Sequence, residues 1–494
     1  MPGTMRRAIA PSLLLAGLLG CTASPTSPAD AALNIVSDLG AHDALDAAAD
    51  DATAAADVPA RPPWPHVLPS ARVMGEARGL RATRAIIHAH SVHSHDACDG
   101  QPYVDGGVNE PCLQRFRRSV CADKIDVVFL TEHSGHMAEG SFERVMQLRP
   151  GDEPLMEGGA LVGYRIACPD GHRTMLLPGA ENALMPIGLA RHPDLVDNNL
   201  DRTYDADDRA AVERFQAAGA LVAIPHVEQR PIAALRALRP DLVEIYNVHA
   251  NIDPRIALTH LGYNPGPALV DLLRFRSTPE LEPDMAFLTF FQESQNDLQK
   301  WATLLAEGLR IPGIAASDAH ENAIPAILGD GERGDSYRRV FRWFSNELLV
   351  RGELTRASAM DAVREGRVFV AFEAFGTPEG FSFTARAGDT THDIGARVPL
   401  SAQPTLEAVA PSVHALDPSL PRPAVRVRIL RAEADGRWTE LAAGAERASF
   451  RPTAAGAYRA EVRILPEHTR PYLPGLERLV REVPWVYASA IYVE

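Results

Sequence analysis

The sequence predicts an α/β fold, with a closed or nearly closed β/α barrel followed by a small antiparallel β domain. Seven short apolar runs alternate with helix-like stretches between residues 84 and 371, which is typical of a β/α barrel. Five of these runs are closely followed by Asp, Glu or His, as expected where barrel strands converge on a site. After Gly376 the runs shorten, Pro and Gly become frequent, and helix patterning largely disappears.

The elements follow in order along the chain. The expected barrel strands cover 84–88, 126–131, 174–178, 221–225, 242–246, 311–316 and 367–371. Helices are expected at 209–218 and at 355–365, the second with Thr355 as its N-cap. The C-terminal strands are expected at 381–385, 424–430, 457–465 and 488–493. These elements indicate a barrel domain over 80–375 and a β-rich domain over 376–494.

The first residues are typical of an export signal. A basic start is followed by an apolar stretch over 8–19, which is shorter than the roughly 20 residues that span a bilayer. Leu18-Leu19-Gly20-Cys21 is similar to a bacterial lipobox, so we expect a signal peptide over 1–21 and a lipid on Cys21. The alternative is an ordinary secretory signal with an incidental cysteine. Either way the protein is expected outside the cytoplasm, and with the lipid it is anchored at the bacterial cell envelope.

Residues 22–75 are expected to be a disordered tether. Ala and Asp supply 21 of the 39 residues from Thr22 to Ala60, which leaves too little apolar surface to order the segment. The net charge of −15 argues against a nucleic-acid-binding surface.

Four cysteines follow Cys21, and an oxidising compartment would allow two disulfides with three possible pairings. The four are Cys98, Cys112, Cys121 and Cys168. The sequence does not choose a pairing, but a staple within the early loop region is plausible.

A histidine-rich segment follows the first expected strand. Residues 88–99 hold four histidines and two aspartates in 12 positions. Side chains at i and i+2 of a strand point to the same side, so His88 and His90 can face one metal ion. A histidine-rich surface loop is the alternative interpretation of this segment alone.

The later strand ends favour the metal interpretation. Acids or histidines stand at or just beyond four further strands, and a helix cap or a core histidine would not explain all of them together. They are Glu132 and His133, Glu181, His226, and Asp318 with His320.

This series of motifs resembles the PHP family, the polymerase-and-histidinol-phosphatase superfamily of metal-dependent hydrolases. The resemblance covers about residues 80–372. It is carried by His88-x-His90, Thr131-Glu132-His133, Gly179-Ala180-Glu181, Pro225-His226 and Ser317-Asp318-Ala319-His320. It implies a distorted (β/α)7 barrel that holds two or three divalent ions, such as Zn, Mn or Fe.

The resemblance also implies a role for each position. His88, His90 and Asp318 would bind one metal, which Glu181 would bridge to a second metal that His226 also binds. His133 and His320 would hold a third metal with an acid of the first loop, where Asp96 is chosen by spacing over Asp99 or His95. His192 is the candidate for one further ligand. Asp318, His133 and Glu181 would be the central catalytic residues.

Three functions follow as hypotheses. The leading one is hydrolysis of a small-molecule phosphoester by metal-activated water. The second keeps the metals and hydrolyses an amide, carbamate or other ester. The third is a non-catalytic lipoprotein that binds a metal or glycan at the cell surface. Glu132 and His93 are candidate general acids, whereas His249 is expected to be an ordinary histidine.

Overall fold

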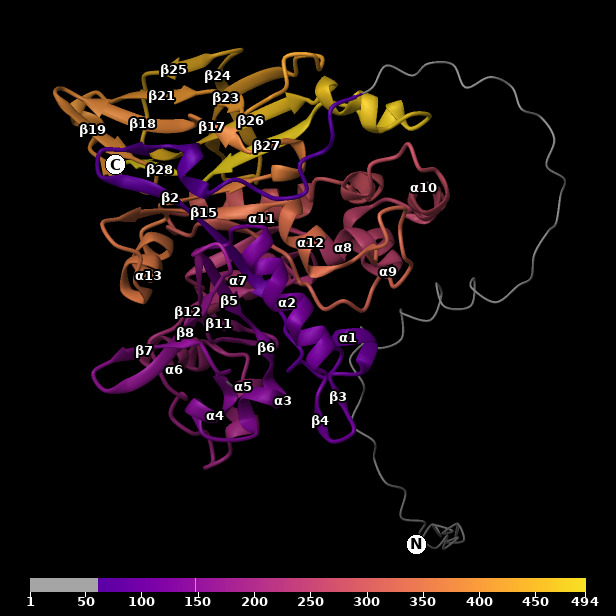
Figure 1. Cartoon of the computed structure of the whole chain (residues 1–494). Helices are drawn as coiled ribbons and strands as arrows, with labels where there is room; N and C mark the ends of the chain where they lie inside the picture. The colour runs from indigo at the N-terminus through magenta and orange to yellow at the C-terminus, as the bar shows by residue number, and fades with distance from the viewer. Residues whose placement is uncertain (1–60, 147) are drawn as a thin grey trace, which may run out of the picture. The chain divides into compact units, whose positions relative to one another are not determined.

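The structure is a computed structural model, and it describes residues 61–146 and 148–494 (Figure 1). The expected signal peptide, the lipid-bearing Cys21 and the tether up to residue 60 lie outside the described residues. Residues 61–75, the end of the expected tether, pack against the body of the protein. Trp64 and Leu68 are buried, and the ring of Trp64 lies 5.1 Å from that of Tyr472. The apolar side chains of this short stretch explain why it packs.

Three parallel strands form one half of the β/α part. They are β2 (Leu80–Ala89), β5 (Val127–Leu130) and β9 (Arg173–Leu177). Nearly all of their residues are buried, as expected for parallel strands that are covered on both faces. β9 is extended on its other side by the antiparallel strands β8 (Ala160–Ala167) and β7 (Glu153–Glu157).

A separate four-stranded sheet forms the other half. Its order is β11 (Met185–Ile187), β12 (Leu221–Ile224), β13 (Leu242–Asn247) and β14 (Gly313–Ala316). The last three strands are parallel, whereas β11 is antiparallel to β12. One buried apolar cluster takes side chains from both halves, including Ile87, Phe129 and Ile314.

All seven expected barrel strands are confirmed as strands, but one closed barrel is not detected among the described residues. The seventh expected strand, β16 (Val368–Ala371), pairs antiparallel with β15 (Ser345–Arg351) and with β27 (Val483–Ala488). β15 in turn pairs antiparallel with β2. The seventh expected strand therefore reaches β2 only through β15, which was not expected from the sequence and runs antiparallel to both of its neighbours.

Helices cover the strands, and both helices expected from the sequence are confirmed. α6 (Arg209–Ala217) precedes β12, and α13 (Arg356–Arg364) begins at Thr355, which forms a capping box with Ser358. The other long helices are α2 (Glu110–Ala122), α10 (Gly266–Ser277) and α11 (Gln295–Ala306). Within the described ranges, none of the helices has the length and apolar character needed to cross a bilayer.

Most regular elements of the C-terminal segment are strands, joined by the short 3-10 helices Leu400–Ala402, Glu467–Tyr472 and Glu477–Leu479 (Figure 1). β26 (Gly456–Leu465) pairs with β27 and with β23 (Ala424–Ala432), so this segment continues the sheet that contains β2. A smaller antiparallel sheet contains β18 (Ser382–Ala387), β19 (Thr390–Asp393), β21 (Thr405–Val409) and β25 (Arg447–Phe450). The expected strand at 488–493 is divided between β27 and β28 (Ile491–Val493).

A buried ion pair connects β2 to the turn after β16. Arg84 and Glu373 are fully buried and form two hydrogen bonds of 2.7 Å. Replacing Glu373 with Gln would leave the Arg84 cation without its charged partner, so we expect the free energy of unfolding to fall by about 3–5 kcal/mol in urea titrations. The exposed pair of Arg236 and Glu307 is the control, and Glu307→Gln should change stability little. A loss below about 1 kcal/mol for Glu373→Gln would contradict this expectation and indicate that Glu347, 3.9 Å from Arg84 Nε, replaces Glu373.

Candidate metal centre

The ends of the parallel strands meet at one place. The backbone N–H of Asp318, just after β14, donates to the carbonyl of His88 at 2.6 Å, and His90 N–H donates to the Ala319 carbonyl at 3.1 Å. Two short strands, β6 (Glu132–His133) and β10 (Ala180–Glu181), pair in parallel beside them. Eight of the nine expected ligands therefore converge from segments far apart in the sequence: His88, His90, Asp96, His133, Glu181, His226, Asp318 and His320.

Two carboxylates lie at the centre of the first group. Ligand atoms of His88, His90, Glu181 and Asp318 all lie within 4.8 Å of one another, and all four residues are buried. His88 Nε2 is 3.3 Å from Glu181 Oε1 and 3.2 Å from Asp318 Oδ1. His90 Nε2 is 3.4 Å from Glu181 Oε2. Imidazole nitrogens and carboxylate oxygens in this arrangement could bind a divalent ion.

His226 approaches the same two carboxylates. Its Nε2 lies 3.3 Å from Glu181 Oε1 and 3.5 Å from Asp318 Oδ2. His249, which the sequence left as an ordinary histidine, also lies here, with Nδ1 3.9 Å from Asp318 Oδ2. His249 belongs to α8 (Val248–Ile252), which starts where β13 ends, and this position after a strand was the signal that could have identified it.

A further group is centred on His133. His90, His133 and His320 form one set of potential ligands, and His95, Asp96 and His133 form another. Asp96 Oδ1 lies 3.2 Å from His133 Nε2, and Asp96 Oδ2 lies 3.4 Å from His320 Nε2. The choice of Asp96 over Asp99 agrees with this geometry. Asp99 instead accepts two hydrogen bonds from Arg333, at 2.8 and 2.9 Å.

In three of the candidate ligands, a hydrogen bond at Nδ1 leaves Nε2 facing the group of carboxylates and histidines. His88 Nδ1 lies 2.6 Å from Glu244, and His320 Nδ1 lies 2.9 Å from the Asp318 carbonyl. His90 Nδ1 lies 2.8 Å from Ser94 Oγ, whose own proton goes to the acceptor Glu132. In each case Nδ1 must carry the proton, because its partner is an acceptor. The buried Nε2 atoms have no hydrogen-bond partner, so a metal ion fits the lone pairs that they would present.

The charges of the site suit a cation. Burial would raise the pKa of Glu181 and Asp318, but nearby histidines, His88 foremost, outweigh it and hold both pKa values well below the usual range. Burial, with repulsion from His320, lowers the pKa of His90 to about 3. Burial also opposes protonation of His133, but Asp96 and Glu181 outweigh it and raise the pKa of that ring to about 9. The two central carboxylates are therefore anionic at neutral pH.

The backbone is strained at the same residues. His88, His226 and Asp318 have φ values of +62°, +50° and +48°, which residues other than glycine adopt uncommonly. His88 also lies at a shift in the register between β2 and β5. The i, i+2 rule for a regular strand therefore does not describe His88 and His90, although both rings reach the cluster. Strained backbone of this kind is concentrated at functional sites.

His192 is the expected ligand that the structure does not bring to the cluster. Its Nδ1 lies 2.9 Å from the Tyr204 hydroxyl and its Nε2 lies 3.0 Å from the Gly140 carbonyl. His192 lies in the loop that follows β11, and both of its ring nitrogens already have hydrogen-bond partners there. The sequence placed His192 by order alone, and the loop geometry directs its side chain elsewhere.

The two candidate general acids also have other partners. Glu132 is buried and accepts hydrogen bonds from Ser91 and Ser94, so it supports His90 indirectly. The ring of His93 stacks on that of His136, with centroids 4.9 Å apart. Neither side chain is among the groups that could hold a metal.

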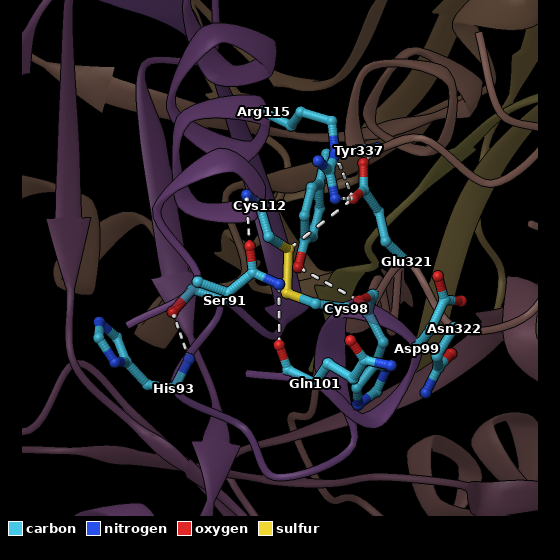
Figure 2. The surroundings of a disulfide bond; sticks show 12 residues. Ser91, His93, Cys98, Asp99, Gln101, Cys112, Arg115, Glu321, Asn322 and Tyr337 are labelled. Carbon is cyan, nitrogen blue, oxygen red and sulfur yellow. Dashed lines mark hydrogen bonds and ion pairs between the residues drawn. A yellow bond between two sulfur atoms is a disulfide. The ribbon is translucent and has the colours of Figure 1, made fainter. Parts of the chain in front are cut away.

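A disulfide lies beside the loop that carries Asp96. Cys98 pairs with Cys112 and Cys121 pairs with Cys168, which selects one of the three possible pairings. Figure 2 shows the first bond between the Asp96 loop and α2, close to Glu321 and Asn322. The backbone N–H of Cys98 donates to the His320 carbonyl at 2.9 Å. The disulfide therefore holds the loop next to one of the candidate ligands.

One solved structure is similar to this chain. No family model matches the chain, and no curated protein matches it. The crystal structure of a two-domain protein from Bacteroides vulgatus ATCC 8482, described as containing a predicted PHP-like metal-dependent phosphoesterase, is similar at 12% identity and a TM-score of 0.35. The match covers 87% of this chain and 99% of that one. The assignment of the site therefore rests on its own residues and their geometry.

Proposed function

We propose that this protein is a metal-dependent hydrolase, and specifically a phosphoesterase with a centre of two or three divalent ions. The observation that carries the proposal is the set of three buried histidines, His88, His90 and His320, whose Nδ1 atoms are all engaged. Their Nε2 atoms have no hydrogen-bond partner and face anionic carboxylates. Most buried side-chain nitrogens have a hydrogen-bond partner, so three unpaired Nε2 atoms that converge on two carboxylates favour a bound cation.

Each residue has a role in this proposal. His88, His90 and Asp318 would hold one ion, and Glu181 lies within 3.4 Å of nitrogen atoms of His88, His90, His133 and His226, so it would bridge neighbouring ions. His133, His320 and Asp96 would hold another. The mixture of imidazole and carboxylate favours Zn, Mn or Fe over Ca or Mg. Such ions supply Lewis-acid activation of water and stabilise the charge that develops during displacement at phosphorus.

The distorted (β/α)7 barrel of the resembled family is part of the proposal. Its support is the shared apolar cluster between the two halves and the hydrogen bonds from Asp318 and His90 that join the ends of β14 and β2. In such a barrel the C-terminal strand ends carry the chemistry, which is where the candidate ligands lie.

Export to the cell envelope, with a lipid on Cys21, is likewise proposed. Its support is the lipobox-like sequence and the two disulfides, because disulfides persist in oxidising compartments. The barrel domain at 80–375 and the β-rich domain at 376–494 are proposed as the two parts of the exported body.

The test is a substrate panel on the full chain, purified without a histidine tag and assayed with added Mn²⁺ or Zn²⁺. Aryl phosphate monoesters and diesters should be hydrolysed, and a chelator should remove the activity. Hydrolysis of aryl carbamates or carboxylic esters with none of the phosphates would keep the metal centre and overturn the phosphoesterase. No turnover of any substrate with either metal would contradict the hydrolase and favour a binding lipoprotein.

A further inference from the structure

We propose that Glu244 is a positioning residue that sets the orientation of His88 and His226 together, so that both rings present Nε2 to the metal centre. This inference rests on the proposed function, since it concerns how the same centre is built. Glu244 is the one charged residue of β13, and only 1% of its surface is exposed. A buried carboxylate is unfavourable unless its oxygens are well hydrogen-bonded.

The first oxygen of Glu244 fixes the ring of His88. Glu244 Oε1 lies 2.6 Å from His88 Nδ1, and both side chains are buried. An ionised carboxylate can only accept, so Nδ1 must donate and carry a proton. In the neutral ring the lone pair is then on Nε2, which lies 3.2 Å from Asp318 Oδ1. A carboxylate behind a metal-binding histidine commonly sets the ring tautomer in this way.

The second oxygen holds the backbone of His226. Glu244 Oε2 accepts from the His226 N–H at 2.9 Å and from Asn247 Nδ2 at 3.2 Å. The left-handed backbone of His226 costs about 1–2 kcal/mol in an unsupported chain, and this hydrogen bond offsets part of that cost. His226 Nε2 is thereby brought within 3.3 Å of Glu181 Oε1.

Asn247, which donates to Glu244, also supports the helix that carries His249. The side chain of Asn247 accepts from the Ala250 N–H at 3.1 Å and so caps α8, the helix that carries His249. The strand itself is irregular here, with a shift in the register against β14 between Glu244 and Tyr246. Such irregularities redirect side chains near functional sites. One carboxylate thus connects His88, His226 and the start of α8.

The chemistry of these three contacts gives a sharp test, because every partner of Glu244 is a donor. In Glu244→Gln the amide keeps one acceptor oxygen and gains an NH₂ group that must face a donor. If the NH₂ faces His88, the ring changes tautomer and Nε2–H points into the site. If it faces His226, the backbone N–H loses its acceptor. Either outcome weakens metal binding, and we expect a loss of about 10–100-fold in affinity.

The measurement is titration of the chelated full chain with Co²⁺, followed by its visible d–d absorption, together with the Tm of the chelated protein. Glu244→Gln should lose Co²⁺ affinity, and its Tm without metal should fall less than that of Glu373→Gln, because it removes a hydrogen bond and leaves no buried cation without its charged partner. Glu373→Gln is the matched control, since it removes another buried carboxylate and should lower the Tm without changing Co²⁺ affinity. A merely structural Glu244 would behave like Glu373, and that result overturns the inference.

A second variant covers the case in which Glu244→Gln does not fold. Glu244→Asp keeps the charge but shortens the side chain by one methylene, so it cannot reach both histidines, and we expect about a tenfold loss of Co²⁺ affinity. Wild-type affinity in this variant overturns the inference and leaves the proposed hydrolase intact. If the wild type itself binds less than one equivalent of Co²⁺, the proposed function fails, and this inference fails with it.

Discussion

Replacing Asp318 with Asn should lower hydrolytic activity at least about 100-fold and remove bound metal. Asp318 lies within 3.6 Å of nitrogen atoms of His88, His90, His226 and His320, so its two oxygens serve more than one part of the centre. Asn is the suitable replacement because it tolerates the left-handed backbone that residue 318 adopts, so the loss reports on charge and not on strain.

The matched control for Asp318→Asn is His192→Ala. His192 was expected from the sequence to be a ligand, but its ring bonds Tyr204 and Gly140 instead. We expect this variant to keep the metal content and turnover of the wild type. Activity and metal content would be measured on both variants in parallel. Unchanged turnover in Asp318→Asn, or loss of metal in His192→Ala, would contradict the assignment of the site.

Removing the Cys98–Cys112 disulfide should selectively release the metal that we propose is held by His133, His320 and Asp96. The bond lies two residues from Asp96, and the loop is hydrogen-bonded to the residues that follow Asp318. Without the bond, Asp96 should no longer be held against His133 and His320. We expect Cys98→Ala/Cys112→Ala to lose about one metal equivalent, measured by elemental analysis, and about 3 kcal/mol of stability from the loop of 14 residues.

The second disulfide distinguishes a local effect from general destabilisation. Cys121–Cys168 closes a loop of 47 residues, so its removal should lower stability by about 4 kcal/mol, which is more than the first. Neither cysteine lies within two residues of a candidate ligand, so Cys121→Ala/Cys168→Ala should retain the metal content of the wild type. If both double variants lose metal equally, the first disulfide has no specific role at the site.

The sequence predicted the parts of the site that follow from strand periodicity and residue type. Each expected strand is present, and acids or histidines at strand ends did converge, because parallel strands bring their carboxyl ends together. The prediction that His192 is a metal ligand was wrong, because order along the chain does not determine where a loop directs a side chain. The strand β15 and its antiparallel pairing with β16 were not predicted, because a short apolar run does not specify the direction of its partner strand.

Other features depend on contacts that no local pattern encodes. The positive φ of His88 and the register shift beside it arise from the pairing of β2 with β5. The disulfide pairing depends on where α2 packs. Glu244 was visible as one acid in an apolar strand, but only the structure shows that its two oxygens face His88 and His226.

The most direct test of the metal centre is elemental analysis of the full chain, purified without chelator and without a histidine tag. We predict two or three equivalents of Zn, Mn or Fe per chain. Less than one equivalent, with no gain when Mn²⁺ or Zn²⁺ is added back, would contradict the metal centre and with it the hydrolase.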